Sequence, residues 1–211
     1  MTYRTIAHDG EHELTIKKSR FITRLARIQT EAEAQTIIAS VRKTHYKANH
    51  NVPAYLLGDD DHIQRANDDG EPSGTAGVPM LQTLQQMGLH DVLAVTTRYF
   101  GGIKLGAGGL IRAYSNSVQE AVHAVGLVER QWQKAVLLTI TYPQLGTVQH
   151  FLEAHQQPVQ HIDYAVDVTL SLNVNEAHVT DLQADLTDLL SGQLTFTTGE
   201  RAFVEVPITT E

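Results

Sequence analysis

The chain of 211 residues contains no cysteine. This absence excludes disulfides, a thiol nucleophile, iron–sulfur clusters and every zinc site that needs sulfur ligands. No apolar run approaches the roughly 20 residues of a membrane-spanning helix, and segment 1–10 lacks the apolar core of a signal peptide. We therefore expect a soluble, cytoplasmic protein that contacts no membrane.

Basic residues are scarce after residue 130, where a helical pattern gives way to a strand-like one. Residues 131–211 hold 2 basic residues (Lys or Arg) against 10 acidic ones (Asp or Glu), whereas residues 1–130 hold 14 basic and 14 acidic residues. The sequence therefore predicts two domains, 1–130 and 131–211, and the apolar content of 42% is enough for a core in each. Because polyanion binding depends on Lys and Arg, only the first domain is expected to attract an anion.

Hydrophobic periodicity predicts a mixed α/β first domain. Thr30 and Glu33 have the spacing of a capping box that opens a first helix, and a second helix is expected to begin at Pro79 and end at Gly88. A long third helix follows a glycine-rich segment and is closed by Gly126. Strands are expected at 14–28, 54–57, 63–65 and 91–100.

The second domain has the element order of a split βαβ unit. A strand pattern at 135–141 precedes a helical pattern at 144–155, and an alternating segment at 164–172 precedes a second helical pattern at 179–189. A final strand is expected at 203–206. The order strand, helix, two strands, helix, strand predicts a ferredoxin-like sandwich. The expected fold class is therefore α+β with two domains.

Segment 68–77 concentrates acidic, hydroxyl and glycine residues just ahead of the second helix. The side chains that could form an acidic or polar pocket there are Asp68, Asp69, Glu71, Ser73 and Thr75. Turn and cap chemistry alone could account for them. Three carboxylates so close together otherwise require backbone amides, Arg or Lys partners, or a cation. Both interpretations remain open at this point.

Segment 98–112 places five glycines in nine positions between a strand and a helix. Glycine lets backbone amides approach a ligand, and the helix that follows supplies unpaired N–H groups and a partial positive charge. The residues that could bind an anion are Arg98, Gly101, Gly102, Lys104, Gly106, Gly108, Gly109 and Arg112. Alternatively, the glycines serve packing and the arginines pair with the acidic segment. Either way, Arg98 or Arg112 should lie within reach of Asp68, Asp69 or Glu71.

Familiar catalytic and metal-binding signatures do not fit this spacing. Gly101 and Gly106 are as far apart as the glycines of a Walker A loop, but Ala107 and Gly108 stand where its Lys and its Ser or Thr are required. The histidines have no recognisable ligand spacing, apart from a string at 8–12 in turn-forming sequence. We therefore expect no catalytic residues, no metal and no cofactor.

Segments 67–77 and 97–114 resemble the two hallmark motifs of the IMPACT/YigZ family, and segments 18–21 and 50–55 also resemble family motifs. The resemblance covers essentially the whole chain. It implies an N-terminal IMPACT domain with the fold of the second domain of ribosomal protein S-five. It also implies a C-terminal ferredoxin-like domain similar to the fifth domain of elongation factor G. The family has no established catalytic residues to transfer.

The resemblance also implies a link to translation, because eukaryotic relatives restrain the amino-acid-starvation kinase by competing for its activator. This sequence has no N-terminal RWD domain, which helps to bind that activator, so the kinase-inhibitor role is not carried over. We expect a regulatory binding protein that contacts the ribosome, RNA or a translation-related protein through its N-terminal domain, with no DNA partner.

Two other functions remain open. One is an enzyme acting on a phosphorylated small molecule, with Lys104 and the glycine-rich segment holding the phosphate, and with Asp68, Asp69 or Glu71 holding a cation or a proton. The other is a scaffold with no ligand pocket.

Overall fold

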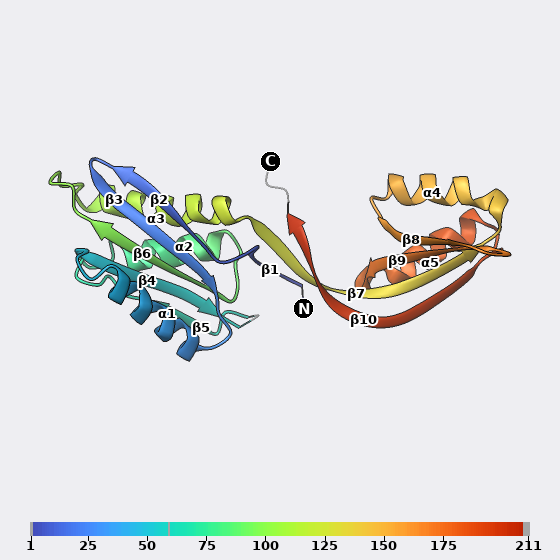
Figure 1. Ribbon diagram of the computed structural model, residues 1–211, viewed down its shortest axis with the longest axis horizontal. Helices are drawn as coiled ribbons and strands as arrows, with labels where there is room; N and C mark the ends of the chain where they lie inside the picture. The colour runs from blue at the N-terminus through green and yellow to red at the C-terminus, as the bar shows by residue number, and fades with distance from the viewer. Residues whose placement is uncertain (1, 59, 209–211) are drawn as a thin grey trace. The chain divides into compact units, whose positions relative to one another are not determined.

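The computed structural model describes residues 2–58 and 60–208, which form two compact units (Figure 1). Among these residues, the N-terminal unit comprises 2–130 and 205–208, and the C-terminal unit comprises 131–204. Strands β7 (Leu127–Ile140) and β10 (Thr195–Ile208) therefore contribute residues to both units. No helix in the described part of the chain is long and apolar enough to cross a membrane.

A five-stranded sheet forms the centre of the N-terminal unit. Its strand order is β2–β3–β6–β4–β5, and every neighbouring pair is antiparallel. The strands are β2 (Gly10–Ile16), β3 (Ser19–Arg27), β4 (His50–Leu57), β5 (Ile63–Ala66) and β6 (Val92–Tyr99). A short strand, β1 (Tyr3–Ile6), pairs instead with β7.

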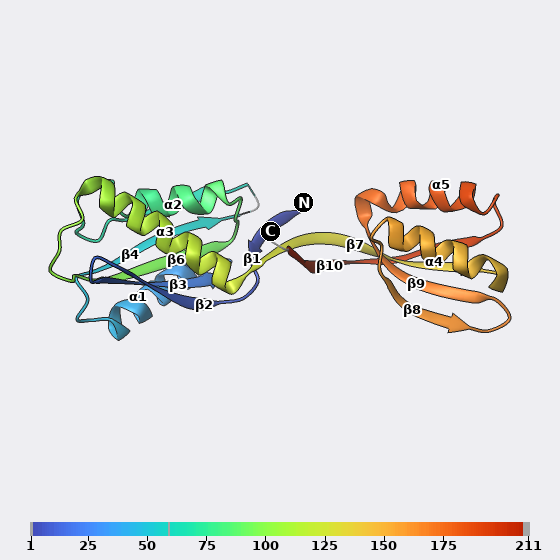
Figure 2. The ribbon, with the colours of Figure 1, turned by 90° about the horizontal axis from the view of Figure 1, so that it is seen from above.

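Helices cover both faces of this sheet (Figure 2). The helices are α1 (Glu31–Thr44), α2 (Gly77–Gln86) and α3 (Ala107–Val125). Val52 and Leu56 of β4 belong to the core shared with α2 and α3, whereas Tyr55 and Leu57 belong to the core shared with α1. Alternate side chains of one strand therefore enter two cores, which explains why β4 is an almost continuous apolar run.

The start of α1 and the end of α3 lie where the sequence predicted them. The Thr30 hydroxyl accepts a hydrogen bond from the Glu33 amide at 3.2 Å, and the Glu33 carboxylate accepts one from the Gln29 amide at 2.7 Å. Gly126, with a φ of 76°, follows α3. Helix α2 begins two residues before the expected Pro79 because the Asp68 carboxylate accepts hydrogen bonds from the amides at its start.

The single strand expected at 14–28 is wrong, because two strands, β2 and β3, form a hairpin there. Ile16 pairs with Ser19 across a two-residue turn formed by Lys17 and Lys18. Both lysines have left-handed backbone conformations, with φ values of 45° and 66°. Such turns favour Asn and Gly, so two lysines give no sequence signal for the turn.

The C-terminal unit is a ferredoxin-like sandwich, as expected. Its strands β7, β8 (Val159–Tyr164), β9 (Val168–Asn175) and β10 lie in the order β10–β7–β9–β8. Numbered along the chain from β7, this is the 4-1-3-2 order of the split βαβ motif. Helices α4 (Leu145–Ala154) and α5 (Val179–Leu189) pack against the sheet and share its apolar core. The α+β class with two domains is therefore confirmed.

Strand boundaries in the C-terminal part of the chain differ from the sequence expectation, and β7, expected at 135–141, already begins at Leu127. Residues 165–167 form a turn, in which the Ala165 amide donates a hydrogen bond to the Asp167 carbonyl at 3.0 Å. The alternating segment 164–172 is therefore not one strand, because it spans the end of β8, this turn and much of β9. The final strand, expected at 203–206, already begins at Thr195. Its residues 197–202 are all exposed, so this part of β10 has no apolar alternation to reveal it.

Candidate functional site

The acidic and glycine-rich segments meet in space, which confirms the expectation from their unpaired charge. Nη1 of Arg98 donates a hydrogen bond to Oε1 of Glu71 at 2.6 Å, and both side chains are more than nine-tenths buried. Arg98 is near the end of β6, and Glu71 lies in the loop before α2. Arg112, the other arginine considered, is exposed on α3. A charge-assisted bond between two buried groups thus fixes the two segments together.

Strand register determines which side chains surround Arg98. Arg98 is the cross-strand neighbour of Phe21 on β3 and of His50 on β4, so the three side chains share one face of the sheet. The guanidinium carbon lies 5.5 Å from the centroid of the Phe21 ring and 5.6 Å from that of Phe100. The cation therefore lies within reach of a cation–π interaction with both aromatic rings.

Glu71 Oε1 also accepts a hydrogen bond from the Tyr114 hydroxyl of α3, at 2.8 Å. His50 Nε2 lies 3.7 Å from the same oxygen. Burial and the nearby Glu71 charge raise the pKa of Tyr114 far above its usual range, so the phenol stays neutral and donates its proton. One carboxylate oxygen thus contacts β4, β6 and α3.

Asp68 serves as a structural acceptor for backbone amides. Its Oδ2 accepts a hydrogen bond from Gly74 at 2.8 Å, and its Oδ1 accepts from Ala76 at 3.1 Å and Gly77 at 2.9 Å. Helix α2 has no side-chain cap from its own N-cap residue, Ala76. Asp68 therefore satisfies the first amides of α2 from eight or nine residues upstream.

Asp69 has different partners from Asp68. Its carboxylate pairs with Arg42 of α1 at 2.7 Å and accepts a hydrogen bond from the Asn51 amide at 2.7 Å. The three carboxylates of the segment therefore do not converge. Within residues 2–58 and 60–208, no group of three or more His, Asp or Glu side chains is placed to hold a metal ion.

The two hydroxyl residues of the acidic segment also lie apart from Glu71. Ser73 is exposed, and the buried Thr75 hydroxyl donates to the Pro72 carbonyl at 2.6 Å. Turn and cap chemistry thus accounts for the contacts of Asp68 and Thr75, whereas the Glu71 contacts extend to the glycine-rich segment.

A cavity of about 460 Å³ opens beside the Arg98–Glu71 pair. Its polar lining includes Glu71, Arg98 and Lys104, and its apolar lining includes Phe100, Leu105 and Leu110. Part of the wall is the segment that connects β6 to α3, residues 100–106, which we call the glycine-rich loop. The cavity combines a few polar groups with a mostly apolar surface, as binding sites for small molecules do.

The glycines have separable roles. A Cβ at Gly101 would lie 2.0 Å from the Lys18 backbone, so the loop packs against the β2–β3 turn only with glycine there. Gly106, the N-cap residue of α3, needs a φ of 71°. A Cβ at Gly108 would meet no atom within 4 Å, and its φ is not positive. Packing explains Gly101, while nothing steric in the described structure requires glycine at position 108.

The N-terminus of α3 is open to a ligand. Gly106 provides no side-chain cap, and the first turn contains no acidic residue. Amides in the first turn of a helix have no intrahelical partner and carry a partial positive charge. Lys104, just before this turn, is exposed. The helix terminus and Lys104 together attract anions to this wall of the cavity.

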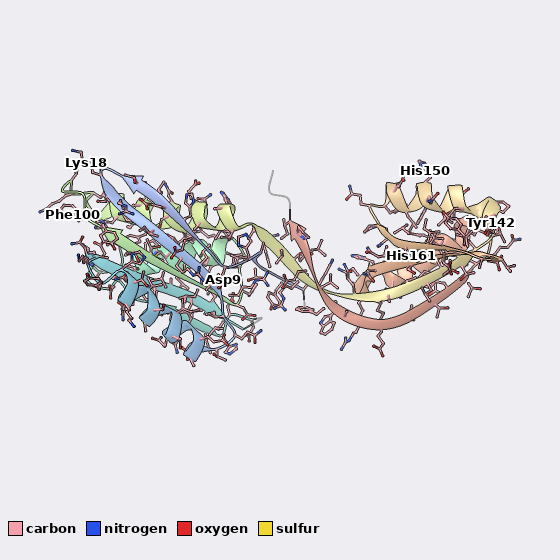
Figure 3. The ribbon with its side chains drawn as sticks, in the orientation of Figure 1. Asp9, Lys18, Phe100, Tyr142, His150 and His161 are labelled. Carbon is pink, nitrogen blue, oxygen red and sulfur yellow. The ribbon has the colours of Figure 1, made fainter. Side chains whose placement is uncertain are left out.

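Lys17 and Lys18 lie at the same end of the unit, a feature that the sequence reasoning missed. Both are exposed in the β2–β3 turn, and Lys18 contacts the glycine-rich loop at Gly101. Figure 3 shows the labelled Lys18 and Phe100 at this end. Within the described residues, Lys17, Lys18 and Lys104, which we call the lysine cluster, form no ion pairs. The sequence signal that could have indicated these residues is a pair of adjacent lysines between two segments of alternating character.

Comparisons with known proteins agree with this architecture. Residues 17–122 match the Impact N-terminal domain, and residues 138–193 match a domain of unknown function, DUF1949. The chain is 46% identical over 204 residues to the IMPACT family member YvyE of Bacillus subtilis, covering 97% of this chain and 94% of YvyE. It is 37% identical over 181 residues to the IMPACT family member YigZ of Escherichia coli, covering 85% and 89%.

More distant and structural similarities add to these matches. A protein IMPACT homolog of Dictyostelium discoideum is 40% identical over 97 residues, which is 44% of this chain and 28% of the homolog. The crystal structure of a protein described as hypothetical matches with a TM-score of 0.59 and 34% identity, covering 94% of this chain and 98% of that one.

Proposed function

Because the chain belongs to the IMPACT family, we propose that it is a translation-linked regulatory binding protein whose N-terminal unit contacts RNA, on the ribosome or free. The link to translation rests on the family, whose eukaryotic members act on the response to amino-acid starvation. The RNA contact rests on the charge and geometry of this chain. The role is a cytoplasmic one and involves neither DNA nor a membrane.

The observation that carries the proposal is the lysine cluster beside the uncapped start of α3. Lys17, Lys18 and Lys104 are exposed without an acidic partner in the described structure. Lysines that neutralise no protein carboxylate are available to replace the counterions of a phosphate backbone, and this exchange drives RNA binding. An uncapped helix N-terminus offers amide donors to the same phosphates.

The distribution of charge supports the N-terminal unit as the part that makes this contact. Residues 131–211 carry only 2 Lys and Arg against 10 Asp and Glu. Both basic residues already pair with Glu176: Nζ of Lys134 lies 3.6 Å from its Oε1, and Nη1 of Arg201 lies 3.3 Å from its Oε2. A strongly acidic surface repels phosphate, so the N-terminal unit is the part that binds.

The contacts of the acidic residues favour a binding role over an enzyme acting on a phosphorylated small molecule. Such an enzyme would need a carboxylate free to hold a cation or move a proton. Asp68 is bonded to backbone amides, Asp69 to Arg42, and Glu71 to Arg98 and Tyr114. These partners occupy the acids that the enzymatic role would use.

Cosedimentation of the full-length protein with purified ribosomes at several salt concentrations tests this function. We expect the protein to pellet with ribosomes at low salt and to be released progressively as salt rises, because a phosphate contact is weakened by competing counterions. The protein spun alone is the control for aggregation. No cosedimentation at low salt, or cosedimentation that does not change with salt, would contradict the proposal.

A further inference from the structure

We infer that the cavity beside Arg98 binds a phosphomonoester attached to an aromatic body, namely the 5′-phosphate and base of a single nucleotide. This inference deepens the proposed function and rests on it, because the RNA proposed as the partner carries nucleotides with a phosphate and a base. The lysine cluster would contact the phosphate backbone in general, whereas the cavity would take one specific nucleotide.

The polar end of the cavity contains a buried cation whose hydrogen bonds are incomplete. The Arg98 side chain is only 7% exposed. Its Nη1 bonds Glu71, but its Nε has no hydrogen-bond partner in the described structure. This Nε is itself sealed from solvent, so Arg98 presents to the cavity the charge of its guanidinium group and not a bond from that nitrogen.

A second set of donors comes from α3. This helix of 19 residues begins at the cavity, and Gly106 and Ala107 are part of the lining. Its first turn has neither a side-chain cap nor an acid, and Lys104 reaches the cavity from the loop before it. Positive charge from a strand and a loop, together with the amide donors of a helix, suits the dianionic phosphomonoester better than the singly charged carboxylate.

Glu71 does not cancel this attraction, although it lines the same cavity. Its Oε1 is engaged by both the Arg98 guanidinium and the Tyr114 hydroxyl, and the whole residue is 8% exposed. His50, 3.7 Å from the same oxygen, is the further titratable group at this end. Glu71 therefore acts as a positioning residue that holds Arg98 in place, while Lys104 and the helix terminus supply the excess positive potential.

The remaining wall fits an aromatic body. Phe100 is 44% exposed although it is a large apolar residue, and Leu105 and Leu110 continue its surface inside the cavity. Exposed aromatic rings beside a phosphate site stack with nucleobases, and every base offers a flat face for this contact. A volume of about 460 Å³ lies within the range of sites for single small molecules.

Titration calorimetry of the full-length protein with AMP, adenosine and inorganic phosphate at low salt tests the inference. We expect AMP to bind at least tenfold more tightly than either adenosine or phosphate, because only AMP uses both ends of the cavity. Replacing Phe100 with leucine should reduce the AMP affinity toward that of phosphate and leave phosphate binding unchanged. Equal affinity for AMP and phosphate, or no AMP binding, would overturn the inference.

Position 108 offers a matched pair of variants that preserve the fold. A Cβ there meets no atom within 4 Å, so we expect the structure to accept both G108D and G108N. An aspartate in the first turn of a helix interacts favourably with the helix dipole, so we expect G108D to keep the fold. We expect G108D to bind AMP at least tenfold more weakly than G108N does, because only the aspartate adds a negative charge to the turn that would hold the phosphate. AMP binding by G108D equal to that by G108N would overturn the inference.

A short oligoribonucleotide, with or without a 5′-phosphate, identifies the source of the nucleotide. If the protein binds the 5′-phosphorylated oligoribonucleotide more tightly, and if G108D removes this difference, the cavity is assigned to the 5′ ends of RNA. Tight binding of AMP without that preference assigns it to a free mononucleotide, and either result supports the inferred chemistry. Failure of AMP binding together with salt-sensitive ribosome cosedimentation would overturn the cavity inference alone. Absence of that cosedimentation would instead overturn the proposed function.

Discussion

Arg98 Nη1 lies 2.6 Å from Glu71 Oε1, and this buried ion pair connects the end of β6 to the loop before α2. The same carboxylate oxygen accepts the Tyr114 hydroxyl of α3. The pair therefore fixes the two segments that line the cavity, and its removal should affect the stability of the N-terminal unit as well as the site.

Replacing Glu71 with glutamine should destabilise the protein by about 3 kcal/mol, because it leaves the buried Arg98 charge without its counter-charge. Urea unfolding followed by circular dichroism measures the change. Glu120 is exposed on α3 and forms no ion pair in the described structure, so E120Q is the matched control. A loss for E71Q no larger than that for E120Q would show that the ion pair contributes nothing to stability.

The Asp68 carboxylate should stabilise the start of α2. We expect D68A to lower the free energy of unfolding by about 2 kcal/mol, since it leaves amides of Gly74, Ala76 and Gly77 without their acceptor. D68N should lose less, because its amide oxygen still accepts a hydrogen bond. Urea unfolding of both variants decides the matter, and equal losses for alanine and asparagine would argue against a capping role.

Tyr114 predicts a pH dependence at the alkaline end. Its pKa in the folded protein is raised above the unfolded value of about 10, so its contribution to stability is complete below pH 10 and is lost as the pH rises beyond it. Above pH 10, unfolding free energy should therefore fall more steeply for the natural protein than for Y114F, by up to about 1.4 kcal/mol per pH unit.

At neutral pH, Y114F should have a free energy of unfolding about 1.5–3 kcal/mol lower than that of the natural protein, because it lacks the hydrogen bond to the charged Glu71 carboxylate. The other tyrosines are common to both proteins, so the difference between their pH profiles isolates Tyr114. Parallel profiles above pH 10 would mean that the phenol ionises as readily in the folded protein as in the unfolded chain.

Local signals in the sequence were sufficient where a residue acts on its near neighbours. Thr30 and Glu33 marked the start of α1, Gly126 marked the end of α3, and the order of elements identified the ferredoxin-like unit. Excess charge in the two segments also predicted that Arg98 or Arg112 would reach one of the acids, and Arg98 does. In each case the pattern is a direct consequence of backbone geometry or of charge balance.

Other features depended on contacts that local sequence does not carry. The turn at Lys17 and Lys18 uses residues that rarely adopt positive φ, and the cap on α2 comes from the distant Asp68. Which acid pairs with Arg98 was equally hidden, because it depends on strand register and on Tyr114 of α3. These choices are made by tertiary packing, which overrides local preference.

RNA binding by variants of Lys104 tests the central claim most directly. Lys104 is exposed and forms no ion pair in the described structure, so K104A should change the stability by no more than about 0.5 kcal/mol. Arg4 is exposed on β1, at the other end of the unit from the glycine-rich loop (Figure 1), so R4A removes the same charge as a control.

The measurement is a titration of labelled single-stranded RNA with the natural protein, K104A and R4A at several salt concentrations. We predict that K104A binds more weakly and that its salt dependence is smaller by about one counterion, while R4A behaves as the natural protein does. An unchanged affinity and salt dependence in K104A, or an equal loss in R4A, would contradict RNA binding through the lysine cluster.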